Sequence, residues 1–359
     1  MKNILLISFI LIQLTLFSKI RAVWVPIWDL ATPEKIDKVV YESIQNNFNQ
    51  LLAEVRYRGD ALYFANKHDS TFANPEKMSY VVKDSLFDPL EYLISKGKKN
   101  GIEIHAWLTM YVVTPHKIQQ LYPEHIYFTH PNWITFKNDK IQMSCNSFEG
   151  AYLDPGLAEV QNYLFNIAMD IALNYDIDGI HLDYIRYPDM EFGYHPLVRE
   201  NYKHKIKYQD AESWQKWKEM QISGLVEKIN AGIRDLNKNI ELTAAVIAKP
   251  EVAQNRYSQN WVGWLEKDII DRVYLMAYTK FTDEFESLVD TVSGFNNNQK
   301  IVFGLRAWDN SKKYKAKEIM EKIEIVKNEF AGIALFSSTG IRQNKYNKVL
   351  KPYLRNLYK

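Results

Sequence analysis

Short apolar runs alternate with amphipathic segments along the chain from residue 21 onward. The predicted strands cover residues 21–27, 50–57, 102–112, 175–188, 240–248, 271–279, 300–308 and 330–338. Between them, apolar residues with helical spacing predict helices over residues 32–47, 88–101, 156–175, 213–237, 315–329 and 344–358. Eight strands that alternate with helices favour a parallel sheet. Eight repeats favour an α/β protein with a single closed (β/α)₈ barrel, a TIM barrel.

Local signals mark the ends of two of these helices. Thr32 is placed to cap the first, with Pro33 at its first position, and Asp88 and Gly101 bracket the second.

An open, doubly wound sheet is the alternative fold for the same pattern of strands and helices. No glycine-rich phosphate loop follows any predicted strand, which disfavours a nucleotide-binding sheet of that kind. No low-complexity linker divides the chain, so residues 19–359 are predicted to form one catalytic domain.

The N-terminus reads as a targeting segment. Lys2 precedes an apolar run from Ile4 to Phe17, and Ser18 is a small residue next to a cleavage point. The run is shorter than the roughly 20 residues that cross a membrane. We therefore predict that residues 1–18 are a signal peptide, with an anchor or a buried first strand as the alternatives. The expected location is the periplasm or the exterior of a bacterial cell, with no stable membrane span after cleavage.

Composition narrows the range of partners. The 359 residues contain 45 Lys and Arg against 43 Asp and Glu, a net charge of +2, which does not indicate a nucleic-acid partner. The 8 His residues form neither an H-E-x-x-H nor an H-x-H pattern, and no G-x-S-x-G elbow is present. No metal or other cofactor is therefore expected. Aromatic residues make up 14% of the chain, which suits sugar binding and also the filling of a large core.

The fourth predicted strand, "YDIDGIHLDYIRYP", contains too many polar residues for a strand that should be buried. Strand alternation places His181 and Asp183 on one face, with Ile180 and Leu182 on the other. Asp183 lies late in the strand, where a barrel enzyme has its active site. Asp178 precedes a glycine at the start of the strand and is expected to have a structural role.

Polar residues also end several other predicted strands. Glu54 and Arg56 end the second strand and, two positions apart, are expected to share a face. His105 and Trp107 share a face of the third strand. Tyr278 ends the sixth, and Arg306 and Trp308 end the seventh. Two of these have a structural alternative. Arg56 could pair with Glu54 or Asp60 as barrel lining, and His105 could be a hydrogen-bonded core histidine.

A carboxylate at a strand end in an aromatic-rich barrel suits glycoside hydrolysis. That reaction uses two carboxyl groups, one that attacks or stabilises the anomeric carbon and one that protonates the leaving oxygen. A nearby Arg would keep Glu54 ionised, which suits sugar binding better than proton donation.

The chain resembles the bacterial family-10-like glycosyl hydrolases, glycosidase-like (β/α)₈ proteins of which many are exported. The resemblance rests mainly on "EVRYRGDALYF" at the second strand and on "LDPGLAEVQNYLFNIAMDIALNYDIDGIHLDYIRYP" through the fourth. It implies a carbohydrate substrate, with Asp183 as the main catalytic carboxylate. It also implies that the site is lined by Arg56, Asp60, His105, Trp107 and Arg186, to which we add Glu54, His181, Tyr184, Tyr278 and Trp308.

Comparison with other glycosidase barrels separates the mechanisms. Chitinase-like barrels end the corresponding strand with a glutamate acid, and Ile185 stands there, which excludes that mechanism. "DGIHLD" is similar in spacing to the amylase-like motif, whose last aspartate is the nucleophile. Asp183 is therefore expected to be a nucleophile with a retaining outcome.

The second carboxyl group is not fixed by these motifs. Other family members often carry an acid directly after the catalytic aspartate, and here that residue is Tyr184. Glu251, just past the fifth strand, is the first candidate for the acid/base, with Asp283 and Glu284 as further candidates. An inactive, carbohydrate-binding barrel is the alternative function. A lyase or aldolase is disfavoured, because Lys249 and Lys280 lie beyond their strands.

Overall fold

The computed structural model describes residues 19–207, 210–308, 315–343 and 346–358. The predicted signal peptide, residues 1–18, lies outside this part of the chain, so its cleavage and the export of the protein stay predictions. None of the described helices combines the length and the apolar character needed to cross a bilayer.

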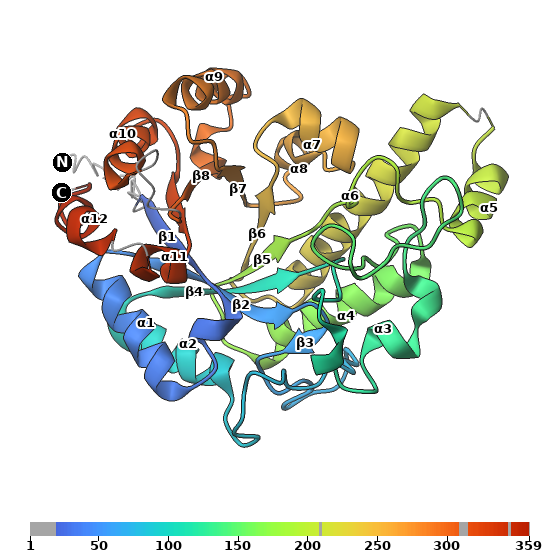
Figure 1. Cartoon of the computed structure of the whole chain (residues 1–359), viewed down its shortest axis with the longest axis horizontal. Coiled ribbons are helices and arrows are strands. Elements are labelled where there is room, and N and C mark those ends of the chain that lie inside the picture. The colour runs from blue at the N-terminus through green and yellow to red at the C-terminus, as the bar shows by residue number, and fades with distance from the viewer. Residues whose placement is uncertain (1–18, 208–209, 309–314, 344–345, 359) are drawn as a thin grey trace, which may run out of the picture.

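Eight parallel strands close into a barrel at the centre of the molecule (Figure 1). In their order around the barrel they are β1 (Ile20–Val25), β2 (Gln50–Tyr57), β4 (Glu103–Thr109), β5 (Gly179–Asp183), β6 (Glu241–Val246), β7 (Arg272–Ala277), β8 (Ile301–Arg306) and β9 (Gly332–Phe336). The barrel closes because β1 pairs with both β2 and β9. A two-residue strand, β3 (Asp60–Ala61), runs antiparallel to the end of β2. The predicted TIM barrel is confirmed.

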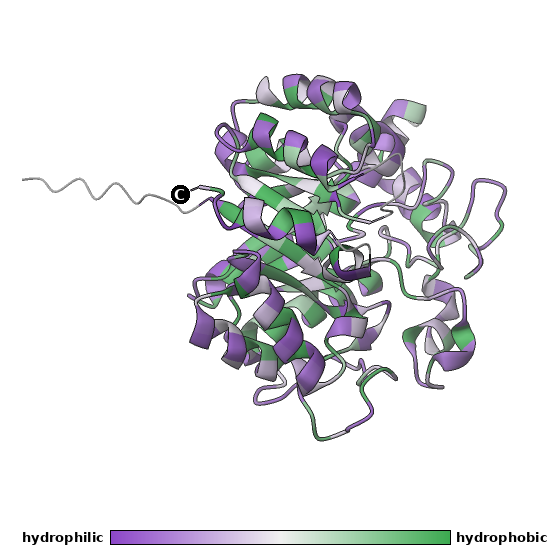
Figure 2. Cartoon of the chain, turned by 60° about the vertical axis from the view of Figure 1, so that its left-hand side comes forward, coloured by the Kyte–Doolittle hydropathy of each residue, from purple (hydrophilic) through white to green (hydrophobic). Residues whose placement is uncertain are grey.

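Helices surround the barrel and turn their apolar sides to it, while the strands form the hydrophobic centre (Figure 2). The longer ones are α1 (Pro33–Gln45), α2 (Pro89–Asn100), α4 (Ala158–Asn174), α5 (Pro196–Lys205), α6 (Ala211–Asp235), α9 (Thr282–Ser293) and α10 (Ala316–Val326). The shorter ones are α3 (Ile126–Thr129), α7 (Pro250–Tyr257), α8 (Trp261–Glu266), α11 (Ser338–Gln343) and α12 (Asn347–Leu354). Four 3₁₀ turns are η1 (Ile27–Asp29), η2 (Ile118–Gln120), η3 (Pro131–Trp133) and η4 (Asn298–Lys300).

The predicted helix caps are confirmed. The Thr32 hydroxyl accepts a hydrogen bond from the Lys35 backbone N–H at 3.4 Å, and Asp88 accepts one from that of Glu91 at 3.1 Å. Gly101 ends α2 in the left-handed conformation, with φ +64°. These caps satisfy backbone groups at the helix ends that have no partner within the helix.

Two segments outside the predicted helices are helical. Glu251 lies in the first turn of α7, and Asp283 and Glu284 lie in the first turn of α9. The buried residues of α9 follow helical spacing, which is a signal that the sequence already contained: Phe285, Leu288, Val289 and Val292.

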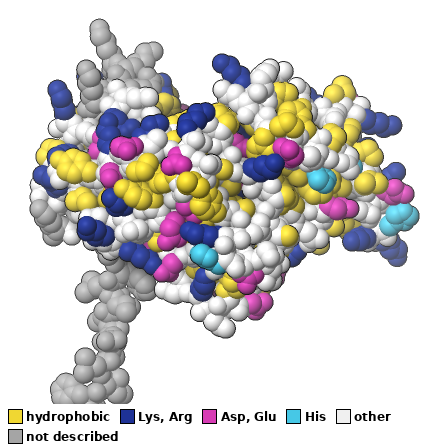
Figure 3. Space-filling model, turned by 90° about the horizontal axis from the view of Figure 1, so that it is seen from below, with side chains coloured by type: hydrophobic (Ala, Val, Ile, Leu, Met, Phe, Trp, Pro, Cys, Tyr) yellow, Lys and Arg dark blue, Asp and Glu magenta, His cyan; other side chains and the backbone are white. Residues whose placement is uncertain are grey.

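Charged side chains of both signs are interspersed over the face that carries α1 and α2 (Figure 3). No large region of a single charge dominates that face, in keeping with the net charge of +2. The long connections after β4 and β5 lie on the side of the barrel toward which the strands point (Figure 1). The carboxyl ends of the strands therefore lie beneath loops long enough to build a site.

Candidate active site

A cavity of about 460 Å³ opens at the carboxyl ends of the barrel strands. Its lining residues come from the ends of β1, β2, β4, β5, β6, β7 and β9, from the segments that follow β1, β2, β4, β5, β6 and β7, and from the last residue of α7. They are Trp24, Pro26, Glu54, Arg58, Trp107, Thr109, Glu149, Asp183, Tyr184, Arg186, Ala245, Ile247, Tyr257, Met276, Tyr278 and Phe336. The size is that of a small-molecule site, and the polar groups converge on one side of aromatic walls.

Asp183 ends β5 and is held by two hydrogen bonds. Trp107 Nε1–H donates to its Oδ2 at 3.0 Å, and the Tyr184 backbone N–H donates to its Oδ1 at 2.7 Å. The carboxyl is only 8% exposed, and burial raises its pKa to about 6 although the Tyr184 N–H, Arg186 and Trp107 oppose the rise. The group is therefore mainly ionised at neutral pH and is fixed in one orientation, as a nucleophile requires.

Tyr184 allows this geometry through a left-handed backbone conformation. Its φ of +51° is unusual for a residue with a side chain and costs about 1 kcal/mol or more. The turn brings its own N–H to the carboxylate of the preceding residue. Its ring stands beside the Arg186 guanidinium, 5.1 Å from ring centre to carbon. Strain at this point is consistent with a functional position rather than a purely structural one.

Glu54 in β2 is the second buried carboxyl of the cavity. The Ile27 backbone N–H donates to its Oε2 at 3.1 Å. The pKa of Glu54 is raised to about 8, mainly by burial and also by the nearby Asp183 charge, although the Ile27 N–H and Arg58 oppose the rise. Glu54 is therefore mainly protonated at neutral pH, whereas Asp183 is mainly ionised. Environments that separate the pKa values of two carboxyls in this way are typical of acid and base pairs.

The expected role of Arg56 is wrong, and a bulge in β2 is the reason. The pairing of β2 with β4 shifts register between Glu54 and Arg56, so the two side chains do not share a face. Arg56 is fully buried outside the cavity, where its Nη2 lies 2.6 Å from Glu76 Oε1 and another nitrogen donates to the Met110 carbonyl at 2.9 Å. It therefore does not hold Glu54 ionised, and Glu54 is free to act as an acid.

The buried Arg56–Glu76 pair gives a stability prediction. Glu76→Gln should lower the free energy of unfolding by about 3–5 kcal/mol, because it leaves the buried guanidinium without a countercharge. Urea unfolding at neutral pH measures the change. Glu124→Gln is the matched control, since Glu124 pairs with Lys77 at the surface, where both side chains are more than half exposed, and it should change stability little. Equal effects of the two variants would contradict the assignment.

Glu149 is a third carboxyl at the cavity that the sequence analysis did not identify. Its Oε1 lies 3.6 Å from Arg186 Nη2, and the Tyr152 hydroxyl donates to its Oε2 at 3.3 Å. Gly150 fixes the loop, because a Cβ there would lie 1.8 Å from the Thr114 carbonyl oxygen. Arg58 also lines the cavity and donates to the Glu149 carbonyl. Nothing in the local pattern of residues 114–154 distinguishes Glu149 from a surface acid.

Three of the aromatic residues predicted to bind the substrate line the cavity: Trp107, Tyr184 and Tyr278. Trp308 packs behind them. Its ring centre lies 5.0 Å from that of Tyr278 and 5.7 Å from that of Phe336. Trp308 is not among the lining residues, so it supports the wall instead of presenting a surface to a ligand.

Three predicted binding residues lie in the core instead. His181 accepts a hydrogen bond from Trp24 Nε1–H at 3.1 Å and contacts the Thr243 hydroxyl at 2.9 Å, and His105 lies 3.0 Å from Gln50 Nε2. Burial lowers the pKa of His105 to about 3 and that of His181 well below its usual value, so both are neutral. Asp60 is buried beneath the loop after β2, where it accepts a hydrogen bond from the Ser79 hydroxyl. His105 therefore has the structural role given as its alternative, whereas His181 and Asp60, for which no such alternative was given, are also buried outside the cavity.

Glu251, the first candidate for the acid/base, lies outside the cavity. It is exposed on the first turn of α7 and does not line the cavity. A general acid must lie within hydrogen-bond reach of the leaving oxygen, and an exposed carboxyl outside the cavity does not. Asp178 has the structural role expected of it, because its carboxylate accepts a hydrogen bond from the Ile104 backbone N–H at 2.8 Å.

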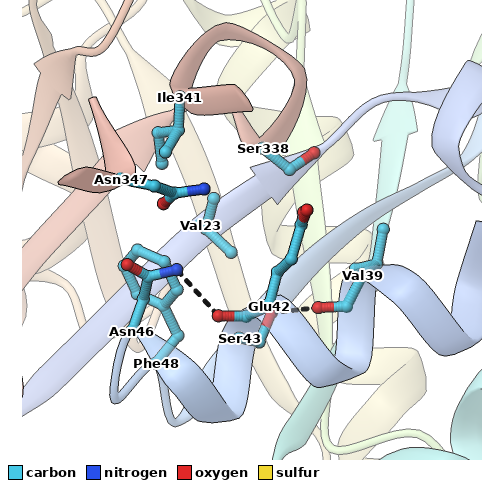
Figure 4. Close-up of a pocket in the computed structure, with 9 residues that line it drawn as sticks. All are labelled: Val23, Val39, Glu42, Ser43, Asn46, Phe48, Ser338, Ile341 and Asn347. Carbon is cyan, nitrogen blue, oxygen red and sulfur yellow. Dashed lines mark hydrogen bonds between the residues drawn. The ribbon is translucent and has the colours of Figure 1, made fainter. Parts of the chain in front are cut away.

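One other hollow is far smaller than this cavity. It lies between α1 and α11 and has a volume of about 10 Å³, room for about one water molecule. Two of its lining residues bond to the backbone of α1, where Asn46 and Ser43 donate to the Glu42 and Val39 carbonyls (Figure 4). Within the described ranges, no group of three or more His, Cys, Asp or Glu side chains is arranged to hold a metal ion.

Sequence comparison places this site in a known family. Residues 19–322 match the family described as glycosyl hydrolase-like 10. The chain belongs to this family. As a glycosyl hydrolase-like 10 protein, it is 23% identical over 259 residues to the glycosyl hydrolase DigH of Escherichia coli, covering 62% of this chain and 55% of DigH. It is 24% identical over 237 residues to the glycosyl hydrolase YngK of Bacillus subtilis, covering 60% of this chain and 42% of YngK. The chain thus spans about half the length of the curated relatives it matches.

The barrel of this glycosyl hydrolase-like 10 protein also has solved counterparts. The glycoside hydrolase domain of PgaB (BpsB) from Bordetella bronchiseptica superposes with a TM-score of 0.70 at 16% identity, over 95% of this chain and 99% of that one. An α-L-fucosidase from Paenibacillus thiaminolyticus superposes with a TM-score of 0.61 at 10% identity, over 94% and 49%. These similarities are to the fold.

Glu54 provides a test of the site that needs no substrate. Its pKa is higher in the folded protein, about 8, than its ordinary value of 4.5, so the folded state retains a proton that the unfolded state releases between those pH values. Stability therefore falls as the pH rises from about 4.5 to about 8, by at most about 5 kcal/mol. Glu54→Gln lacks this loss, so it should be more stable than the natural protein at pH 9, with the difference vanishing near pH 4. Thermal unfolding of both proteins across this range measures it, and a constant difference would contradict a buried, protonated Glu54.

Proposed function

We propose that the protein is a glycoside hydrolase that acts on a polysaccharide or oligosaccharide, with Asp183 as nucleophile, Glu54 as acid/base and retention at the anomeric carbon. One observation carries the proposal. Two buried carboxyls line the same cavity, one mainly ionised and one mainly protonated at neutral pH. Membership of the glycosyl hydrolase-like 10 family, and relatives named as glycosyl hydrolases, support the same reaction class.

The two carboxyls divide the reaction between them. An Asp183 oxygen attacks the anomeric carbon while the Glu54 proton passes to the leaving oxygen, which breaks the glycosidic bond and forms a glycosyl ester on Asp183. Glu54, now a carboxylate, then takes a proton from a water molecule that attacks the same carbon. The ester breaks and both carboxyls return to their starting states. The Asp183 charge is lost in the ester, which makes Glu54 easier to ionise when it must act as a base.

The other cavity groups bind and orient the sugar. Trp107 holds Asp183 and forms part of the wall with Tyr278 and Phe336, whose rings suit the apolar C–H faces of a pyranose. Glu149 and Arg186 offer an acceptor and a donor for sugar hydroxyls. Glu149 is 40% exposed and paired with Arg186, so we assign it to binding rather than to proton transfer.

The alternative function, an inactive barrel that only binds sugar, has less support. That alternative rested on the absence of a second carboxyl beside Asp183 in the strand motif. Glu54 provides a second carboxyl from β2, which β4 separates from β5 and which lines the same cavity.

Incubation with a panel of purified polysaccharides and peptidoglycan strands tests the proposal, with released fragments identified by mass spectrometry. A cell-wall glycan or another amino-sugar polymer is the substrate we propose, since an exported bacterial enzyme would meet such polymers. Fragments whose masses show one water added for each bond cleaved would support hydrolysis. Release by the natural protein and not by Asp183→Asn is the expected pattern, and no release from any polymer would contradict it.

A further inference from the structure

Trp28 is a large aromatic residue that stands exposed beside the cavity. It lies in η1, directly after β1, and 46% of its surface is exposed. Its ring packs edge-on against Tyr57, with centres 5.8 Å apart, and against Tyr80, with centres 6.4 Å apart. Lys35 Nζ donates to the Trp28 carbonyl at 3.0 Å, which fixes the turn. The three rings form a supported surface, which we call the Trp28 platform.

The Trp28 platform is continuous with the catalytic groups. Pro26 lines the cavity, and the N–H of Ile27 donates to the Glu54 carboxyl, so the turn that carries Trp28 is bonded to the proposed acid. On its other side, the Arg58 guanidinium lies 5.2 Å from the centre of the Tyr57 ring and also lines the cavity. A ligand that leaves the cavity past Glu54 and Arg58 therefore meets the exposed indole next.

The cavity also extends on the opposite side of the barrel. A hollow of about 200 Å³ between the segments that follow β6 and β7 shares Ile247, Met276 and Tyr278 with the cavity. In a closed barrel of eight strands, β6 and β7 lie across from β1 and β2. The cavity that contains Asp183 and Glu54 thus has the Trp28 platform on the side of β1 and β2, and this hollow on the side of β6 and β7.

We propose that the Trp28 platform binds a sugar unit of a glycan chain, at a distance from the bond that is cleaved, so that the protein acts on extended chains in preference to short ones. The inference rests on the glycosidase function proposed above. An indole that is 46% exposed offers a flat apolar surface to the apolar face of a pyranose, and Arg58 can donate to the hydroxyls at its rim. The hollow at β6 and β7 leaves room for the chain to continue past the cleavage point. A single exposed aromatic residue is ordinary at a protein surface, but this one is braced by two further rings on the path into the cavity.

Binding measurements in the Asp183→Asn protein test the platform without turnover. The probes are chitin oligosaccharides of two to six units and peptide-free peptidoglycan strands, measured by calorimetry and by gel retardation. Adding Trp28→Ala should weaken binding of the longest probe about three- to tenfold. The loss for the two-unit probe should be clearly smaller, and Trp28→Phe should restore part of the difference. Tyr41→Ala is the matched control, because Tyr41 is 62% exposed on α1 away from the cavity and should leave all affinities as they are.

The outcomes separate the platform from the enzyme. Equal losses for short and long probes, no loss on Trp28→Ala, or no binding of any probe would overturn the platform. If the natural protein hydrolyses a polymer while Trp28→Ala binds it normally, the platform fails and the glycosidase function stands. If binding depends on Trp28 and no polymer is cleaved, the platform stands and the glycosidase function fails.

Discussion

Asp183→Asn is expected to lower kcat on the natural substrate by on the order of 10⁴-fold, while the substrate still binds. The amide keeps the shape of the side chain and can still accept from Trp107 Nε1–H, but it cannot form the glycosyl ester. It also removes the negative charge that raises the pKa of Glu54. The two proteins are compared by steady-state kinetics on the polymer identified in the panel, with binding measured separately.

Asp178→Asn is the control for this substitution. Asp178 lies at the start of the same segment and binds the Ile104 backbone N–H, remote from the cavity. It should affect stability more than kcat. Full activity of Asp183→Asn would contradict the proposed nucleophile, and an equal loss of kcat in Asp178→Asn would mean that the effect is structural.

Glu54→Gln is expected to lower kcat on a polysaccharide by about 10²–10⁴-fold, because a sugar leaving group needs a proton. On an aryl glycoside, whose leaving group departs without protonation, the bond-breaking step should lose much less. The natural protein should show a bell-shaped dependence of kcat/KM on pH, with limbs near pH 6 for Asp183 and near pH 8 for Glu54. In Glu54→Gln the limb near pH 8 should disappear, and the limb near pH 6 should remain.

Glu251→Gln is the matched control for the acid. Glu251 is exposed on α7, so its removal should leave both the rate and the pH profile as they are. If Glu251→Gln loses the limb near pH 8 instead, Glu251 and not Glu54 is the general acid. Equal losses on polysaccharide and aryl glycoside in Glu54→Gln would contradict proton donation by Glu54.

The fold could be predicted because its signals are local and repeated. Each strand is an apolar run and each major helix an amphipathic one, and Thr32, Asp88 and Gly101 mark helix ends with the residue types that those positions require. The position of Asp183 was also predictable. Side chains alternate between the two faces of a strand, and active sites of barrel enzymes lie at the carboxyl ends of the strands. The two hydrogen-bond donors to Asp183 are Trp107, in the neighbouring strand β4, and the backbone N–H of the residue that follows Asp183.

The partner of Asp183 was not predictable in the same way. A one-residue bulge in β2 reverses the side on which Arg56 lies, and no residue in "AEVRYRG" announces it. The regular alternation of side chains along a strand therefore placed Arg56 beside Glu54, whereas the arginine near Glu54 is Arg58. For the same reason Glu54 was expected to be ionised. The pKa of Glu54 depends on burial by segments that are distant in the sequence, including the turn of Ile27. The local sequence around Glu54 does not show these contacts. Glu149 depends likewise on the path of a long loop.

The most direct test of Asp183 as nucleophile is to trap the glycosyl ester. The protein is incubated with 2-deoxy-2-fluoro glycosyl fluorides of the sugars in the identified substrate, and the digested protein is analysed by mass spectrometry. Asp183 and Glu149 lie in the same tryptic segment, residues 141–186, so fragmentation spectra must locate the added sugar. We predict a sugar on Asp183 in the natural protein and in Glu54→Gln, and none in Asp183→Asn. A sugar on Glu149 or Glu54, or a protein that hydrolyses its substrate and is never labelled, would contradict the proposed mechanism.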